Sequence, residues 1–124
     1  MTKNILLVED EPLLLDLYQE AFEDAGLEVE IAENGAEALK KADKNPRLIL
    51  LDILMPGMNG FEVLKKLKNN SKTKDIPVIV LTNLGSEQSD KDKQLALSLG
   101  AVDYLVKSYH TPDEIVEIVE KRLG

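Results

Sequence analysis

One stretch near the middle of the chain reads Arg47-Leu48-Ile49-Leu50-Leu51-Asp52-Ile53. Its apolar run is broken by a single acidic residue, close to its end. Continuous apolar runs of four to eight residues are typical of strands that are buried on both faces, as in a parallel sheet. Similar runs recur at Ile5–Val8, Pro77–Leu81 and Val102–Val106, with a weaker, alternating example at Val29–Ala32.

Longer segments with helical periodicity separate these runs. They are Pro12–Ala25, Gly35–Lys44, Gly60–Asn70, Ser86–Leu99 and a last helix that starts at Thr111. In the first segment, Leu14, Leu17, Ala21 and Ala25 recur at steps of three and four residues, which places them on one face and predicts a helix. In the last one, Thr111 can cap the helix, Pro112 suits its first turn and Glu114 can complete a capping box. Its expected buried face is Ile115, Ile118, Val119 and Leu123.

Strands and helices thus alternate five times along the chain. This order predicts an α/β fold with a doubly wound parallel sheet of five strands and five helices. In such folds ligands bind beyond the carboxyl ends of the strands. The residues that follow each strand are therefore the first candidates for function.

Length and composition narrow the class of protein. The chain has 124 residues, which predicts one domain spanning residues 1–124. It has no cysteine and a net charge of −8, from 15 basic and 23 acidic residues. These features exclude a disulfide scaffold and a thiolate metal site, and they disfavour binding to nucleic acid or to anionic membranes. The acidic N-terminal stretch lacks the features of a secretory signal, and no apolar run approaches a membrane span, so we expect a cytoplasmic protein.

Acidic residues dominate the predicted strand ends. Glu9, Asp10 and Glu11 follow the first strand, and Asp52 ends the third. Close carboxylates repel one another and lose hydration beside an apolar sheet, and a divalent cation relieves both costs. Magnesium prefers oxygen ligands, so Glu9, Asp10 and Asp52 are predicted to form a Mg²⁺ site. With no thiols and with the single histidine, His110, in a loop, a zinc site is disfavoured.

A hydroxyl and a lysine follow the remaining two strands. Thr82 ends the fourth strand and Lys107 ends the fifth. Phosphoryl transfer depends on positioning and on neutralising charge on the phosphoryl oxygens, which Mg²⁺, Lys107 and Thr82 would share. Asp52 would then be the nucleophile that forms an acyl phosphate.

These motifs resemble the receiver domains of two-component response regulators, over nearly the whole chain. The matching stretches are Val8–Glu11, Leu51–Gly60, Val80–Thr82 and Gly100–Lys107. The resemblance implies a flavodoxin-like sheet with strand order 2-1-3-4-5. It implies that Asp52 is the phosphoacceptor and that Thr82 and Lys107 bind the phosphoryl oxygens. It also implies that the metal ligands are Glu9, Asp10, Asp52 and the backbone carbonyl of Leu54, and that Tyr104 is the switch aromatic.

The same resemblance implies partners and a mode of action. The phosphoryl donor would be a sensor histidine kinase or a phosphotransfer protein, and the chain would catalyse only its own phosphorylation and dephosphorylation. Thr82 would move toward the phosphoryl group and Tyr104 would rotate inward, so that the surface formed by 86–99, 102–106 and the last helix repacks. This surface would bind a second copy or an effector through side chains of both signs: Lys91, Lys93, Asp103, Glu117 and Lys121.

Four positions in the chain are considered as departures from the family pattern. Ser108 follows Lys107 where the family usually has proline after a cis peptide bond, so either the bond is strained or it is trans and Lys107 is aimed differently. Asn83 replaces a small residue and is expected to narrow access to Asp52 or to bond the phosphoryl group. Leu54 and Leu84 are apolar, and we expect them to slow hydrolysis of the acyl phosphate.

Other interpretations of these residues exist. Glu9–Glu11 also suits an acidic helix start, Lys107 a surface lysine, and Tyr104 an ordinary core aromatic. An aspartate-dependent phosphohydrolase would need a second acid at the position of Leu54. A scaffold without phosphoryl chemistry would lack the acids or the lysine, and a flavodoxin-like cofactor binder would need a phosphate-binding loop after the first strand.

Overall fold

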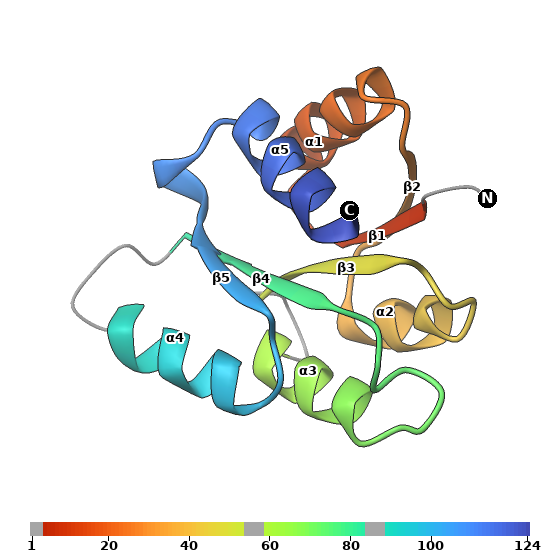
Figure 1. The fold of residues 1–124 in the computed structure, drawn as a ribbon, viewed down its shortest axis with the longest axis vertical. Helices are drawn as coiled ribbons and strands as arrows, with labels where there is room; N and C mark the ends of the chain where they lie inside the picture. Colours follow the sequence, from red (N-terminus) through yellow and green to blue (C-terminus); the bar gives the residue numbers. More distant parts are fainter. Residues whose placement is uncertain (1–3, 54–58, 84–88) are drawn as a thin grey trace.

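The computed structural model describes residues 4–53, 59–83 and 89–124. Five parallel strands form one sheet in the order β2-β1-β3-β4-β5 (Figure 1). The strands are β1 (Asn4–Val8), β2 (Glu28–Ala32), β3 (Leu48–Asp52), β4 (Val78–Thr82) and β5 (Asp103–Val106). The predicted doubly wound sheet and its strand order are confirmed, and each strand lies within two residues of its expected position.

Helices cover both faces of this sheet. They are α1 (Pro12–Asp24), α2 (Gly35–Ala42), α3 (Gly60–Lys68), α4 (Ser89–Ser98) and α5 (Pro112–Leu123), and a short 3₁₀ helix, η1 (Lys107–Tyr109), follows β5. α1 and α5 pack on one face, and α2, α3 and α4 lie on the other (Figure 1). The predicted start of the fourth helix, at residues 86–88, lies outside the described residues.

The central strand β3 shows why its sequence is continuously apolar. Ile49 and Leu51 belong to the core on the side of α2, α3 and α4, whereas Leu48 and Leu50 belong to the core beneath α1 and α5. All four side chains are fully buried. Alternate residues of a strand point to opposite faces, so a sheet that is covered on both sides requires apolar residues at every position.

Side-chain caps fix the starts of three helices. Asn34 and Asn59 each accept a hydrogen bond from the backbone N–H three residues later, at the starts of α2 and α3. At α5, Thr111 accepts from the Glu114 N–H, and Glu114 accepts from the Thr111 N–H. The predicted capping box is confirmed.

The apolar face expected for the first helix is only partly confirmed, because Leu14 and Ala21 pack against the core but are only partly buried. In α1 the buried residues are Leu15, Tyr18 and Phe22. Leu17 and Ala25 are instead exposed. The apolar run at residues 13–15 allows more than one helical face. The face with two aromatic rings buries more apolar surface, and it is the face that packs on the sheet. In α5, Ile115 and Val119 are buried as predicted, together with Val116, while Ile118 and Leu123 are only partly buried.

Strand register brings the predicted site residues to one edge of the sheet. Val8 pairs with Leu51, Asp52 with Leu81, and Thr82 with Val106. The residues at or just after these strand ends therefore lie side by side. Within the described part of the chain, no helix combines the length and apolarity that crossing a membrane requires.

Candidate functional site

Asp52 lies at the centre of this edge. It is the last residue of β3, between β1 and β4, and is 3% exposed. Its carboxylate accepts a hydrogen bond from the Lys107 ammonium, with 3.1 Å between Asp52 Oδ2 and Lys107 Nζ. A buried carboxylate at a strand end, held by one lysine, has a defined position from which to act as a nucleophile.

Glu9 and Asp10 lie next to Asp52, in the turn between β1 and α1. Glu9 is 1% exposed, and its backbone N–H bonds to the carbonyl of Ala32. Its carboxylate accepts from the N–H of Asp10 at 3.1 Å and forms an ion pair with Lys107. One carboxylate oxygen each of Glu9, Asp10 and Asp52 lie within 4.8 Å of one another. The structure thus brings the three predicted acids together.

Lys107 and the acids shift each other's pKa values. Burial acts to raise the pKa of Glu9, but hydrogen bonds with the Asp52 and Lys107 side chains, together with the Lys107 charge, hold it below its ordinary value. Burial acts to lower the pKa of Lys107, but the hydrogen bonds and charges of Glu9 and Asp52 hold it above its ordinary value. The lowered pKa of Glu9 and the raised pKa of Lys107 both favour a buried ion pair in which Glu9 is ionised and Lys107 is protonated.

The donor set fits a hard divalent cation. The group contains three carboxylates, and the single Lys107 ammonium pairs with two of them, so negative charge remains in excess. Mg²⁺ takes ligands of this kind and keeps several water molecules. The fourth predicted ligand, the carbonyl of Leu54, lies outside the described residues.

Lys107 reaches the acids from a 3₁₀ turn directly after β5. The Lys107–Ser108 peptide bond is trans. Of the two alternatives that the missing proline left open, the structure therefore has the trans bond. Lys107 nevertheless points to the site, with 7% of its surface exposed. Backbone turn geometry alone is enough to direct its side chain.

Thr82 and Tyr104 lie on the neighbouring strands. Thr82 ends β4 and is fully buried. Tyr104 is 6% exposed and packs in the core on the side of α2, α3 and α4, so its ring already lies inside. Burial raises the pKa of the Tyr104 hydroxyl, and nearby Thr82 acts in the opposite direction. The hydroxyl makes no hydrogen bond of normal geometry to any described residue.

The remaining candidate residues are more exposed or cannot be placed. Asn83 is exposed beside Thr82, and His110 is partly buried just after η1. Leu84 lies outside the described residues, as does Leu54. The expectation that these two leucines slow hydrolysis therefore stays a prediction.

Sequence reasoning did not single out Tyr18, which packs in the core between α1 and the sheet. This residue of α1 is buried, and burial raises the pKa of its hydroxyl. The charges of Lys107, Glu9 and Asp52 also contribute to the pKa of that hydroxyl. The spacing of Leu15, Tyr18 and Phe22, at i, i+3 and i+7, was the signal that could have identified it.

The sequence is similar to known proteins over most of its length. Residues 5–120 match the family model described as the response regulator receiver domain. The CpxR homolog of Haemophilus influenzae, a transcriptional regulatory protein, is 40% identical over 114 residues, which are 92% of this chain and 48% of that protein. The Bacillus subtilis alkaline phosphatase synthesis transcriptional regulatory protein PhoP is 40% identical over 116 residues, covering 93% of this chain and 46% of PhoP. The chain therefore spans about half the length of these relatives.

Solved structures show the same fold. Chemotaxis protein CheY4 of Vibrio cholerae superimposes with a TM-score of 0.86 at 33% identity, over 98% of both chains. The BeF₃-activated N-terminal receiver domain of Klebsiella pneumoniae RstA superimposes with a TM-score of 0.84 at 27% identity, over 97% of both chains.

Proposed function

The chain belongs to the receiver domain family of response regulators, and from this membership we propose that Asp52 accepts a phosphoryl group from a phosphohistidine. Histidine kinases are general partners of this family. The observation that carries the proposal is the burial of Asp52 beside Glu9, Asp10 and Lys107 at one edge of the sheet. The donor would be a sensor histidine kinase or a phosphotransfer protein.

The proposed transfer uses Asp52 as the nucleophile. A carboxylate oxygen of Asp52 attacks phosphorus, an O–P bond forms, and the N–P bond of the donor breaks, which leaves the bond electrons on the imidazole. Lys107 lies 3.1 Å from Asp52 Oδ2 and is placed to bind an oxygen of the transferred group. Thr82 ends the adjacent strand, and we assign its hydroxyl to another of these oxygens.

Glu9, Asp10 and Asp52 are the residues that would hold Mg²⁺, with the Leu54 carbonyl as a further predicted ligand. When bound, the ion would neutralise charge between the carboxylate and the incoming phosphoryl group. Lys107 pairs with both Glu9 and Asp52, and its charge and hydrogen bond help to hold the pKa of Glu9 below its ordinary value.

We assign the signalling output to the surface formed by α4, β5 and α5. Tyr104 links this surface to the site, because it lies on β5 and its hydroxyl is close to Thr82. A phosphoryl group that draws Thr82 toward it would alter the packing around Tyr104 and favour one arrangement of α4. Exposed Lys91, Lys93, Glu117 and Lys121, with partly buried Asp103, would then bind a second copy or an effector.

The chain is a signalling domain, and we propose that it catalyses only its own phosphorylation and dephosphorylation. Residues 1–124 would act as one receiver domain in the cytoplasm, where ATP-dependent kinases make the phosphohistidine donor. Leucine at position 54 argues against turnover of separate phosphate esters, because phosphohydrolases of the aspartate class place a second acid there.

Intact mass after incubation with acetyl phosphate and Mg²⁺ tests this function. We expect one phosphoryl adduct on the wild-type chain and none on Asp52→Asn. Asp16→Asn, which alters an exposed aspartate of α1, is the matched control and should be modified like wild type. An adduct of equal yield on Asp52→Asn would overturn the assignment of Asp52.

A further inference from the structure

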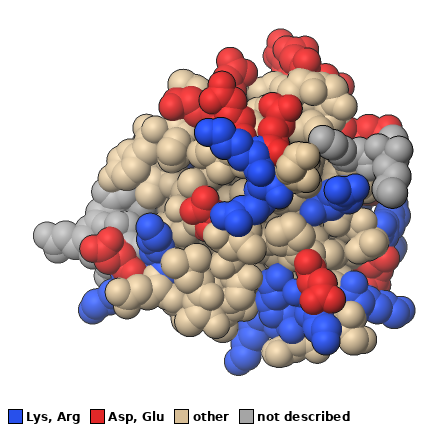
Figure 2. Space-filling view, viewed as in Figure 1, with Lys and Arg blue, Asp and Glu red and all other residues tan. Residues whose placement is uncertain are grey.

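Charge is unevenly distributed along this chain. Residues 4–39 contain eleven acidic residues and no lysine or arginine, whereas residues 40–74 contain nine basic residues and three acidic ones. Figure 2 shows acidic side chains gathered at the upper edge, over α1 and α5, and basic ones concentrated at the lower edge, over α3. One molecule therefore carries two surfaces of opposite charge.

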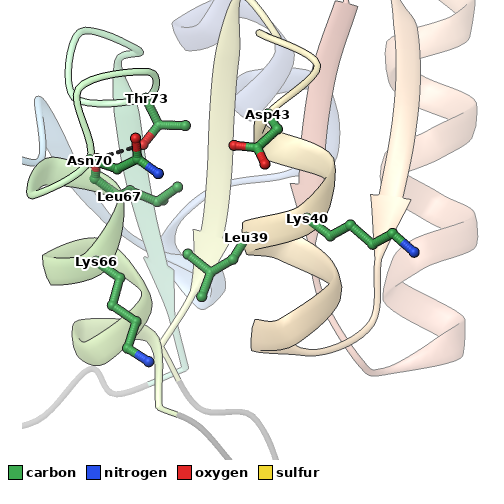
Figure 3. Close-up of a pocket in the computed structure, with 7 residues that line it drawn as sticks. All are labelled: Leu39, Lys40, Asp43, Lys66, Leu67, Asn70 and Thr73. Atoms are coloured by element: carbon green, nitrogen blue, oxygen red, sulfur yellow. Dashed lines mark hydrogen bonds between the residues drawn. The ribbon is translucent and has the colours of Figure 1, made fainter.

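The basic surface contains a hollow between α2 and α3, of about 490 Å³. Leu39 and the buried Leu67 lie between the two helices, and Asp43 of the α2 end also lines the hollow. Lys66 and Lys40 extend outward from α3 and α2, on either side (Figure 3). Both lysines are exposed, and neither forms an ion pair within the described residues. The hollow thus offers the partly buried Leu39 as an apolar contact, and its two lysines against the single acid Asp43 leave positive charge in excess at its rim.

The acidic surface presents a matching helix. Leu13, Leu17, Glu20 and Asp24 lie on one exposed stripe of α1, at i, i+4, i+7 and i+11. Leu13 is 69% exposed and Leu17 is 46% exposed, so two large apolar side chains face solvent. The stripe therefore combines exposed leucines at one end with acidic residues at the other.

We propose that the α1 stripe of one molecule docks into the α2–α3 hollow of a second copy of this chain. Leu13 and Leu17 would contact Leu39, while Glu20 and Asp24 would pair with the exposed lysines at the rim, Lys66 and Lys40. This is the helix-in-groove mode, with an apolar anchor and complementary charge at its rim. Leu39 and the acid Asp43 favour such a helix over a nucleic acid, whose phosphates gain nothing from leucine and are repelled by a carboxylate.

The contact joins two different surfaces, so each docked molecule still has one surface open. One helix in one hollow buries less area than a standard interface, so the association is weak and depends on concentration. The α1 helix begins directly after Glu9–Glu11. If the proposed function of Asp52 holds, a copy docked on α1 would also hinder access of a phosphodonor.

Sedimentation velocity with two complementary variants tests the contact. Lys40→Glu/Lys66→Glu alters the hollow and keeps the helix stripe, whereas Leu13→Ser/Leu17→Ser alters the stripe and keeps the hollow. Wild type should show a sedimentation coefficient that rises between about 20 µM and 1 mM, the range of weak affinity. Each variant alone should stay monomeric, and their mixture should form a 1:1 dimer that grows no further.

The control is Arg47→Glu/Lys72→Glu, which makes the same charge change outside both the hollow and the surface formed by α4, β5 and α5, and it should associate like wild type. All substituted side chains are exposed, and thermal melting of each variant checks that it is folded. Monomeric wild type at the highest concentration would overturn the proposal. A mixture without the 1:1 dimer, or control variants that lose association, would overturn it equally, and none of these results bears on the chemistry of Asp52.

Discussion

At the residue scale, Lys107 holds the candidate site together. Its ammonium pairs with Glu9, 98 positions earlier in the chain, and with Asp52, 55 positions earlier. All three side chains are almost completely buried. Removing one partner from a buried ion pair is costly because it leaves uncompensated charge away from water.

Lys107→Met should therefore destabilise the protein by about 3–5 kcal/mol, because two carboxylates would lose their shared cation. The double variant Lys107→Met/Asp52→Asn should lose less than the single one, since it removes one of the repelling charges. Urea unfolding in the presence of a chelator measures the free energy of unfolding of both variants. The control is Lys121→Met, at an exposed lysine. Equal losses in the single and double variants would contradict this description of the pair.

The sequence predicts where Asp52 lies, but it does not predict the contact between Lys107 and Glu9. An acid that follows four apolar residues is placed at the end of a buried strand, and this located Asp52. Lys107 was expected to serve phosphoryl oxygens, but its ion pair with Glu9 was not foreseen. That contact joins residues far apart in sequence and depends on the turn at η1, which local patterns do not define.

At the element scale, the junction between β3 and α3 is the tightest point near the site. The Gly60 N–H bonds to the carbonyl of Ile53, at 2.9 Å. A Cβ atom at position 60 would lie 2.4 Å from Ile53 Cα and 2.7 Å from the backbone oxygen of Asp52. Glycine is therefore required for α3 to begin against the end of β3.

Gly60→Ala should cost about 1–3 kcal/mol of stability, the usual range for overpacking. Because the added methyl group meets the backbone of Asp52, phosphorylation by acetyl phosphate should also slow. Urea unfolding and the initial rate of adduct formation measure the two effects. A variant with wild-type stability and rate would show that the junction has more room than the structure gives it.

The capping box of α5 should make the stability of the protein depend on pH. Hydrogen bonds from the Thr111 backbone and side chain hold the pKa of Glu114 below its ordinary value of 4.5. A carboxyl group whose native pKa is lowered stabilises the fold above its unfolded pKa, and this contribution disappears as pH falls through the native value. Below about pH 4.5, the melting temperature of wild type should fall more steeply than that of Glu114→Gln.

Thr111→Ala is the companion variant. It removes the cap and should cost about 0.5–2 kcal/mol at neutral pH. It should also flatten the acid slope, because the Thr111 side chain contributes to the shift of Glu114. Parallel slopes for all three proteins below pH 4.5 would contradict the assigned role of the box.

Helix α1 shows where sequence periodicity becomes ambiguous. Its stripe of Leu14, Leu17 and Ala21 is regular, but so is the stripe of Leu15, Tyr18 and Phe22. The second one packs on the sheet because large aromatic rings bury more surface, which leaves Leu17 outside. Where apolar residues surround a helix, tertiary packing decides between the two faces.

At the scale of the whole molecule, the fold could be predicted almost completely. Runs such as 48–51 and helical segments such as 60–70 differ clearly in periodicity, and their alternation leaves few topologies open. The parallel sheet then brings all strand ends to one edge. The hollow between α2 and α3 could not be foreseen, because it depends on how two helices that follow different strands pack against each other.

Magnesium should stabilise the whole fold, because the acid cluster exists only when the strands are assembled. At about ten times its dissociation constant, a ligand that binds only the native state adds about 1.4 kcal/mol. Wild type should therefore melt at a higher temperature in MgCl₂ than in chelator, whereas Asp10→Asn should lose most of that gain. Asp16→Asn is the control, and a gain that survives in Asp10→Asn would place the ion elsewhere.

The most direct test identifies the carboxylate that carries the phosphoryl group. Borohydride reduces an acyl phosphate to an alcohol, so a phosphorylated aspartate becomes homoserine at a position that peptide mass mapping can read. After treatment with acetyl phosphate and Mg²⁺, we predict homoserine at position 52 alone, and none when the metal is chelated. Homoserine at position 10, or at no position in a protein that gained the adduct, would contradict the assignment of Asp52 as the nucleophile.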